Sequence, residues 1–104
     1  DGVKSARILY LYPSTTTFRL IDKISDSKVF QTYYDMPIQH IDDRMLKIMK
    51  RGFGEGKTKG LLEYMKSKKD AFIRTSIIVG HPQEDDEAFE RVCEFVDEFG
   101  FDRI

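Results

Sequence analysis

The sequence predicts an α/β fold with about four parallel strands and helices on the outer face of the sheet. Strand-like segments alternate with helix-like segments of about 10 to 16 residues, the order typical of parallel strands joined by right-handed crossovers. The two clearest strands each have one apolar and one polar face, which favours a barrel-like sheet with a wet or ligand-filled interior. The 104-residue chain starts at one strand and stops within another, so we expect part of a larger domain.

The first strand and helix are separated by a change of hydrophobic period at Pro13. Residues 6–12 form an almost continuous apolar run, as in a strand that is covered on both faces. Residues 14–17 are Ser and Thr, which cap helix N-termini well, and the helix that follows carries Ile21 and Ile24 on one side.

The middle of the chain predicts a second strand and two helices. Residues 33–40 alternate in polarity like a strand, although Pro37 lowers the expected regularity of its hydrogen bonds. Asp42 and Asp43 suit the positive end of the next helix. A glycine-rich loop and a further helix with an apolar face then follow, at residues 52–56 and 61–65.

The last third of the chain predicts a third strand, a long helix and the beginning of a fourth strand. Residues 72–79 form the strand, which stops before Gly80 and Pro82. Residues 84–99 form the helix, with acids in its first turn, and residues 101–104 begin the next strand. The helix has an apolar stripe made of Phe89, Val92, Cys93, Val96 and Phe99.

Composition excludes several classes of protein. Seventeen Lys and Arg against eighteen Asp and Glu give a net charge of -1, which argues against strong nucleic-acid binding. No apolar run approaches the roughly 18 residues that cross a membrane, and the first residues do not resemble a signal peptide. A single cysteine allows neither an internal disulfide nor a cysteine-cluster metal site, and it favours a reducing, cytoplasmic location.

Three local motifs have ordinary structural explanations. Residues 51–58 imitate a phosphate-binding loop, but the glycine spacing is wrong and the segment follows a helix rather than a strand. Cys93 shares the apolar stripe of its helix, so we expect it to pack in the core rather than to act as a nucleophile. The acids at residues 85–87 suit a helix N-terminus, and the lysines at residues 66–69 suit a helix end.

The strands also place charged and polar groups where a site is expected. Arg74 and Asp35 lie on the polar strand faces, and burying either charge alone is costly, so we expect a ligand, water or an ion pair there. Parallel α/β architectures bind ligands at the carboxyl ends of their strands. Two of these ends hold the only histidines of the chain, His40 and His81.

Four segments, in order along the chain, match one family pattern. Residues 35–40 (DMPIQH) and 43–52 (DRMLKIMKRG) follow the pattern D-[IM]-P-[LI]-Q-H…D-x-[VM]-L-K-x-M-x-R-G. Residues 74–82 (RTSIIVGHP) are similar to R-T-x-x-I-V-G-F-P-G-E-T, and residues 7–13 (RILYLYP) to the preceding strand. By these segments the chain resembles the radical S-adenosylmethionine methylthiotransferases over nearly its whole length.

The resemblance implies a fragment of a partial (β/α) TIM-like barrel, with residues 1–104 inside the radical domain. It also implies S-adenosylmethionine and two 4Fe-4S clusters as cofactors of the full-length parent. The family holds its radical cluster through a C-x-x-x-C-x-x-C loop, which this sequence lacks, as it lacks the second cluster's cysteines and the C-terminal RNA-binding-type domain. We therefore expect no catalytic or metal-binding residue in this chain, and no activity of the chain alone.

The pair Gln39-His40 is similar to the RimO-type branch, whose members methylthiolate an aspartate of protein S 12 of the small ribosomal subunit. The tRNA-modifying MiaB-type branch usually carries Q-S-G at this point and is the alternative. More remote alternatives are another parallel α/β barrel enzyme and a non-enzymatic binding module, and open sheet edges favour association in either case.

The resemblance implies five candidate cofactor-binding residues. Gln39 and His40 lie where the family motif meets the barrel mouth, as candidates to contact S-adenosylmethionine or the substrate aspartate. Arg74 offers a fixed charge for a carboxylate, and Gly80 and Pro82 shape a loop that lets the backbone approach the cofactor. The loop departs from the family pattern at three positions, His81, Gln83 and Asp85.

Overall fold

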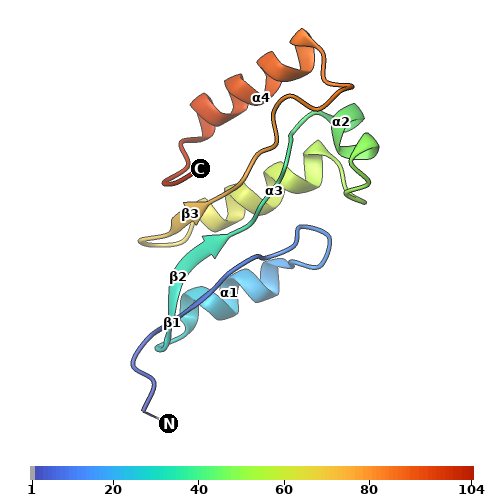
Figure 1. Ribbon diagram of the computed structural model, residues 1–104. Coiled ribbons are helices and arrows are strands. Elements are labelled where there is room, and N and C mark those ends of the chain that lie inside the picture. Colours follow the sequence, from blue (N-terminus) through green and yellow to red (C-terminus); the bar gives the residue numbers. More distant parts are fainter. Residues whose placement is uncertain (1) are drawn as a thin grey trace.

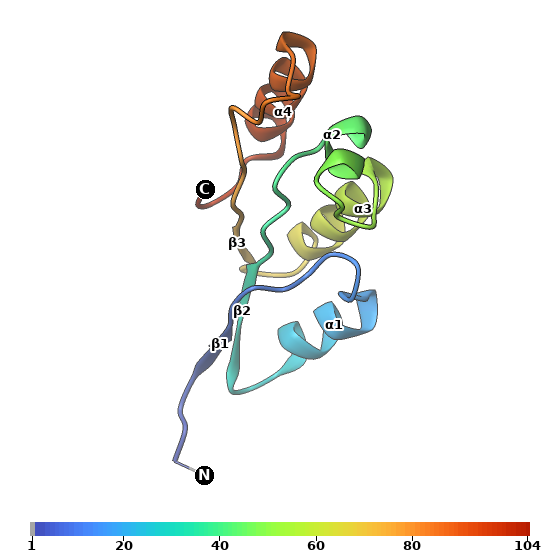
Figure 2. The ribbon, with the colours of Figure 1, turned by 45° about the vertical axis from the view of Figure 1, so that its right-hand side comes forward.

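The computed structural model describes residues 2–104 and contains a three-stranded parallel sheet in the order β1-β2-β3 (Figure 1). The elements are β1 Ala6–Ile8, α1 Phe18–Asp26, β2 Phe30–Asp35, α2 Asp43–Ile48, α3 Glu55–Lys66, β3 Phe72–Arg74 and α4 Asp86–Phe99. Helices α1, α2 and α3 lie on one side of the strands, and α4 lies along the β3 edge (Figure 2). Within residues 2–104 no helix is long and apolar enough to cross a membrane.

The pairing of the strands confirms the predicted α/β fold. Tyr34 pairs with Ile73, and Asp35 with Arg74, both in parallel. At the position predicted for a fourth strand, Arg103 forms an isolated parallel bridge with Arg74. The predicted fourth strand is therefore represented in residues 2–104 by one bridge rather than by a regular strand.

The regular strands differ in extent from residues 6–12, 33–40 and 72–79, which the sequence predicts. The backbone explains the early end of β1, because Tyr10, just beyond Ile8, has a φ of 62°. A left-handed residue turns the chain out of the extended conformation that a ladder needs. The expectation that residues 6–12 are covered on both faces is wrong, since Leu9 is 48% and Tyr10 72% exposed.

In the extended segment after β2, the hydroxyl of Thr75 replaces the backbone hydrogen bonds that Pro37 interrupts. Pro37 has no N–H to donate, so the neighbouring backbone groups need another partner. Thr75 is 1% exposed; its hydroxyl donates to the Met36 carbonyl at 2.8 Å and accepts from the Ile38 N–H at 3.2 Å. Parallel pairing then resumes at Gln39, which forms an isolated bridge with Ile77 in the segment after β3.

The core lies between the sheet and the helices that cover it. Tyr34, Met36 and Ile38 are all 0% exposed, which confirms that the apolar face of this segment points to the helices. They pack against apolar residues of α1 and α3, namely Ile21, Ile24, Leu61, Leu62 and Met65. The polar face of the sheet is left on the other side, where α1, α2 and α3 do not reach (Figure 2).

Three helices begin at side-chain caps of the expected type. Thr17, Asp42 and Asp85 each accept a hydrogen bond from the backbone three residues on, at 3.1, 3.1 and 2.8 Å. Helix α4 therefore begins after Asp85 rather than at Glu84 as predicted. Glu84 lies outside the helix, and its carboxylate is available for other contacts.

The prediction that Cys93 packs in the core is wrong. Cys93 is exposed, as is Phe89 of the same stripe at 44%, whereas Val92 is 2% exposed. The side of α4 that carries Cys93 borders an open, mostly apolar groove of about 240 Å³ instead of a packed layer. The groove is lined by Ile77, Val79, Val92, Cys93, Val96 and Ile104.

Candidate functional site

Gln39 joins the loops at the carboxyl ends of β2 and β3. Its N–H donates to the Ser76 carbonyl, and its carbonyl accepts from the Ile78 N–H, both at 2.9 Å. With both backbone groups paired and a φ of 70°, the residue is held in a left-handed conformation by the neighbouring strand. Its side chain is half-buried at this edge, so the amide is available to a ligand.

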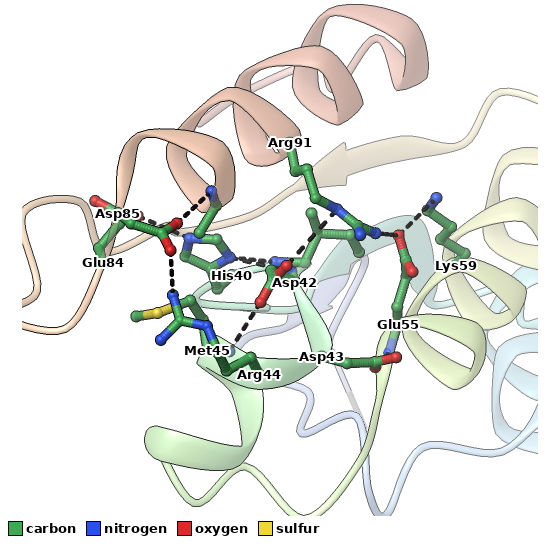
Figure 3. Close-up of polar contacts among 12 residues, drawn as sticks. His40, Asp42, Asp43, Arg44, Met45, Glu55, Lys59, Glu84, Asp85 and Arg91 are labelled. Carbon is green, nitrogen blue, oxygen red and sulfur yellow. Dashed lines mark hydrogen bonds and ion pairs between the residues drawn. The ribbon is translucent and has the colours of Figure 1, made fainter.

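His40, the next residue, is 0% exposed. Its Nδ1 accepts hydrogen bonds from the N–H groups of Ile41 and Asp42 at 3.0 and 3.1 Å (Figure 3). An Nδ1 that accepts two bonds carries no proton, so Nε2 carries it and donates to the Glu84 carboxylate at 2.7 Å. The imidazole is thus neutral, and both of its nitrogens are engaged within the protein.

Glu84 is the partner that sequence reasoning missed. Its side chain is 6% exposed, and its second oxygen accepts from the Gly80 N–H at 2.9 Å. Burial alone would raise the pKa of Glu84, but the hydrogen bonds from Gly80 and His40 outweigh it, and the pKa is lowered. A signal was present: Glu84 keeps the residue of the family segment while the positions on either side depart from it.

Gly80 and Pro82 lie on the exposed loop that Glu84 holds. Gly80 has a φ of 82°, which only glycine adopts without strain, and a Cβ built there meets no atom within 4 Å. The loop is closed by two further bonds from the Glu84 N–H to the His81 carbonyl at 2.8 Å and from the Gln83 N–H to His81 Nδ1 at 3.1 Å. Open space therefore lies next to a backbone of fixed shape.

Arg74 forms the ion pair that was one of the predicted alternatives. Its Nε lies 3.8 Å from the carboxylate of Asp35, which is 1% exposed. The Tyr33 hydroxyl and the Asp35 carboxylate raise the pKa of Arg74, and the Tyr10 N–H donates to Asp35 at 3.3 Å. The structure groups Gln39, His40 and Gly80 at the carboxyl-end edge of the sheet. Arg74 lies instead on the polar face of the sheet, where it forms an ion pair with Asp35.

Arg51 is a second residue that sequence reasoning missed as a candidate. Its guanidinium lies 4.8 Å from the ring centre of Tyr12 and 5.4 Å from that of Phe53. One terminal nitrogen donates to the Pro37 carbonyl at 2.9 Å, whereas the buried Nε has no hydrogen-bond partner. It forms no ion pair with any of residues 2–104, and it belongs to the R-G end of the family motif, the one signal that marked it.

A network of charged side chains ties the helices together beside His40 (Figure 3). Arg91 of α4 lies 2.6 Å from Glu55 of α3 and 3.7 Å from the α2 cap Asp42. Arg44 of α2 lies 3.2 Å from the α4 cap Asp85. Exposed pairs of this kind contribute little stability each, but together they fix the three helix ends around the histidine.

The sequence pattern of the Radical SAM superfamily matches residues 3–96. The chain belongs to the radical SAM superfamily. It is 73% identical over its whole length to the ribosomal protein uS12 methylthiotransferase RimO of Sulfurovum sp., and 62% identical to the RimO of Sulfurimonas denitrificans. It is 59% identical over 99% of its length to the RimO of Aliarcobacter butzleri. The chain spans 23% to 24% of the length of these relatives.

Members of the radical SAM superfamily use an iron-sulfur cluster, and the described residues do not fit one. No group of three His, Cys, Asp or Glu that could hold a metal ion occurs within residues 2–104. Cys93 is alone on the outside of α4, and a cluster of this kind needs several thiolates. Residues 2–104 therefore do not hold such a cluster by themselves.

Proposed function

We propose that this chain is part of the radical domain of a methylthiotransferase that modifies an aspartate of ribosomal protein S 12. The observation that carries the proposal is the identity of 73% to a RimO, which extends over the whole chain. Gln39-His40, the pair that favours the RimO-type branch over the tRNA-modifying branch, supports it further. In the full-length protein the partners are S-adenosylmethionine, two 4Fe-4S clusters and S 12.

In this proposal the edge formed by Gln39 and the loop Gly80–Pro82 binds S-adenosylmethionine. The Gln39 amide offers a donor and an acceptor, and the left-handed Gly80 leaves room for a ligand next to the backbone. Arg51 fits a carboxylate, since it has a buried Nε without a partner and no ion pair within residues 2–104. When bound, S-adenosylmethionine supplies the group that removes a substrate hydrogen and also the methyl group.

The remaining candidates have supporting parts in the proposal. Arg74 neutralises Asp35 on the interior face, and its side chain, 35% exposed, can share its charge with a carboxylate of cofactor or substrate. His40 contacts no ligand directly, because its ring is buried and both nitrogens are engaged. Pro82 restricts the loop on which Gly80 lies.

The test uses the full-length protein, reconstituted anaerobically with iron and sulfide and mixed with S-adenosylmethionine, reductant and S 12. Mass spectrometry then quantifies 5′-deoxyadenosine and methylthiolated S 12. The proposal expects both products. 5′-Deoxyadenosine without modified S 12 directs the search to tRNA as substrate, and neither product from fully loaded protein overturns the proposal.

A further inference from the structure

We infer that His40 is a positioning residue that couples the end of β2 to the loop after β3 through Glu84, and so holds Gly80 in the shape that admits the cofactor. The inference deepens the proposed function and rests on it. In this inference His40 supports the binding loop without contacting the ligand itself. Its first support is burial, because the ring is 0% and the Glu84 side chain 6% exposed.

The coupling has a defined direction of hydrogen bonding. The two backbone N–H groups that donate to Nδ1 select the tautomer with its proton on Nε2. That proton then meets a carboxylate oxygen of Glu84 at 2.7 Å, which makes a charge-assisted bond in a place shielded from water. The start of α2 therefore determines which histidine nitrogen faces Glu84.

Glu84 links His40 to Gly80 because its carboxylate makes no hydrogen bond that caps α4. Asp85 caps α4, so the Glu84 carboxylate takes no part in the side-chain cap of that helix. One of its oxygens accepts from His40 and the other from the Gly80 N–H at 2.9 Å. Without His40 a buried carboxylate would keep one partner, and turning out to solvent would become favourable.

The consequence reaches the site through Gly80. When Glu84 turns away, the Gly80 N–H loses its acceptor, and a glycine at a φ of 82° has many other conformations available. A loop that spends part of its time in other shapes lowers the apparent affinity by the fraction that is competent. We therefore expect weaker cofactor binding without any loss of a direct contact.

Two substitutions of His40 separate the two halves of the imidazole. His40→Gln places an amide nitrogen where Nε2 lies and keeps the bond to Glu84, but it loses the acceptor for the two backbone donors. His40→Asn places an oxygen where Nδ1 lies and keeps that acceptor, but it cannot reach Glu84. Glu87→Gln, at an exposed position of α4 outside the proposed binding loop, is the control.

The experiment uses the full-length reconstituted protein and three readouts. Hydrogen exchange measures protection of the Gly80 amide, anaerobic calorimetry measures the Kd of S-adenosylmethionine, and single-turnover kinetics separates binding from chemistry. For His40→Asn we expect lost Gly80 protection and a Kd increase of about tenfold or more, as for removal of a charge-assisted hydrogen bond. For His40→Gln and Glu87→Gln we expect a Kd within about threefold of the parent.

Equal effects of His40→Asn and His40→Gln, or lost Gly80 protection with an unchanged Kd, would overturn the inference. Should His40 variants fail to fold, Glu84→Gln answers the same question, with the exposed Glu87→Gln as its control. The proposed function fails in a distinguishable way, since a parent protein that does not bind S-adenosylmethionine can still show the Gly80 protection pattern.

Discussion

Replacing Thr75 by valine removes one hydroxyl and keeps the shape of the side chain. That hydroxyl serves two buried backbone groups, the Met36 carbonyl and the Ile38 N–H, and Thr75 itself is 1% exposed. A buried backbone group left without a partner costs about 1 to 3 kcal/mol. For two such groups, partly relieved by relaxation, we expect Thr75→Val to lower the free energy of unfolding by about 2 to 4 kcal/mol.

The assay is chemical denaturation of the full-length protein, followed by hydrogen exchange of the Ile38 amide. Thr75→Ser keeps the hydroxyl and loses a methyl group, so it should cost only about 1 kcal/mol. Thr32→Val is a further control, because Thr32 is a half-buried residue of β2 whose hydroxyl is not part of this pairing. If Thr75→Val proves as stable as Thr75→Ser, the hydroxyl does not replace the ladder at Pro37, and the reasoning is refuted.

Three further outcomes follow from the site and its supports. Arg74→Ala should leave the buried Asp35 without its cation and weaken S-adenosylmethionine binding or turnover of the full-length enzyme; unchanged values in both assays would remove Arg74 from the candidates. The pKa of Glu84 is lowered from its ordinary 4.5, so its stabilisation is present above about pH 4.5 and is lost as the pH falls through the folded-state pKa. The stability difference between the parent and Glu84→Gln should therefore be constant at neutral pH and shrink in acid, and a difference that grows in acid would contradict the lowered pKa. Asp85→Ala should cost about 1 kcal/mol through the lost α4 cap, measured by thermal unfolding, and no loss of stability would show that the cap is dispensable.

The order of elements and the strand faces could be predicted because they follow from hydrophobic period. Tyr34, Met36 and Ile38 alternate with polar residues, and a period of two determines which side of a sheet is buried. The strand ends could not be predicted in the same way. Tyr10, just beyond the end of β1, adopts a left-handed backbone conformation that its residue type does not suggest, and its N–H donates to the Asp35 carboxylate of the neighbouring strand.

The candidate site was predictable in position but not in its connections. The rule that parallel sheets bind ligands at the carboxyl ends of their strands predicted that Gln39, His40 and Gly80 lie at one edge, and in the structure His40 and Gly80 both contact Glu84 there. Glu84 was interpreted as an acid near a helix N-terminus, because the helix dipole explains any acid there equally well. Only the fold shows that it faces a histidine 44 residues away in sequence. The prediction that Cys93 is buried was wrong for a related reason. A periodic stripe predicts which side of α4 is apolar but not whether another layer covers that side.

The left-handed backbone at Gln39 sends two adjacent side chains to different surroundings. Gln39 lies half-buried at the edge of the sheet, where a ligand can reach it, whereas His40 is fully buried and donates a hydrogen bond to Glu84. Two neighbouring residues therefore have different physical constraints: the Gln39 side chain is partly open to solvent, and the His40 side chain is bound to a distant loop. Introducing this dipeptide into a related barrel should reproduce the accessible Gln39 side chain, but it should reproduce the His40 contact only if an acid equivalent to Glu84 is introduced as well.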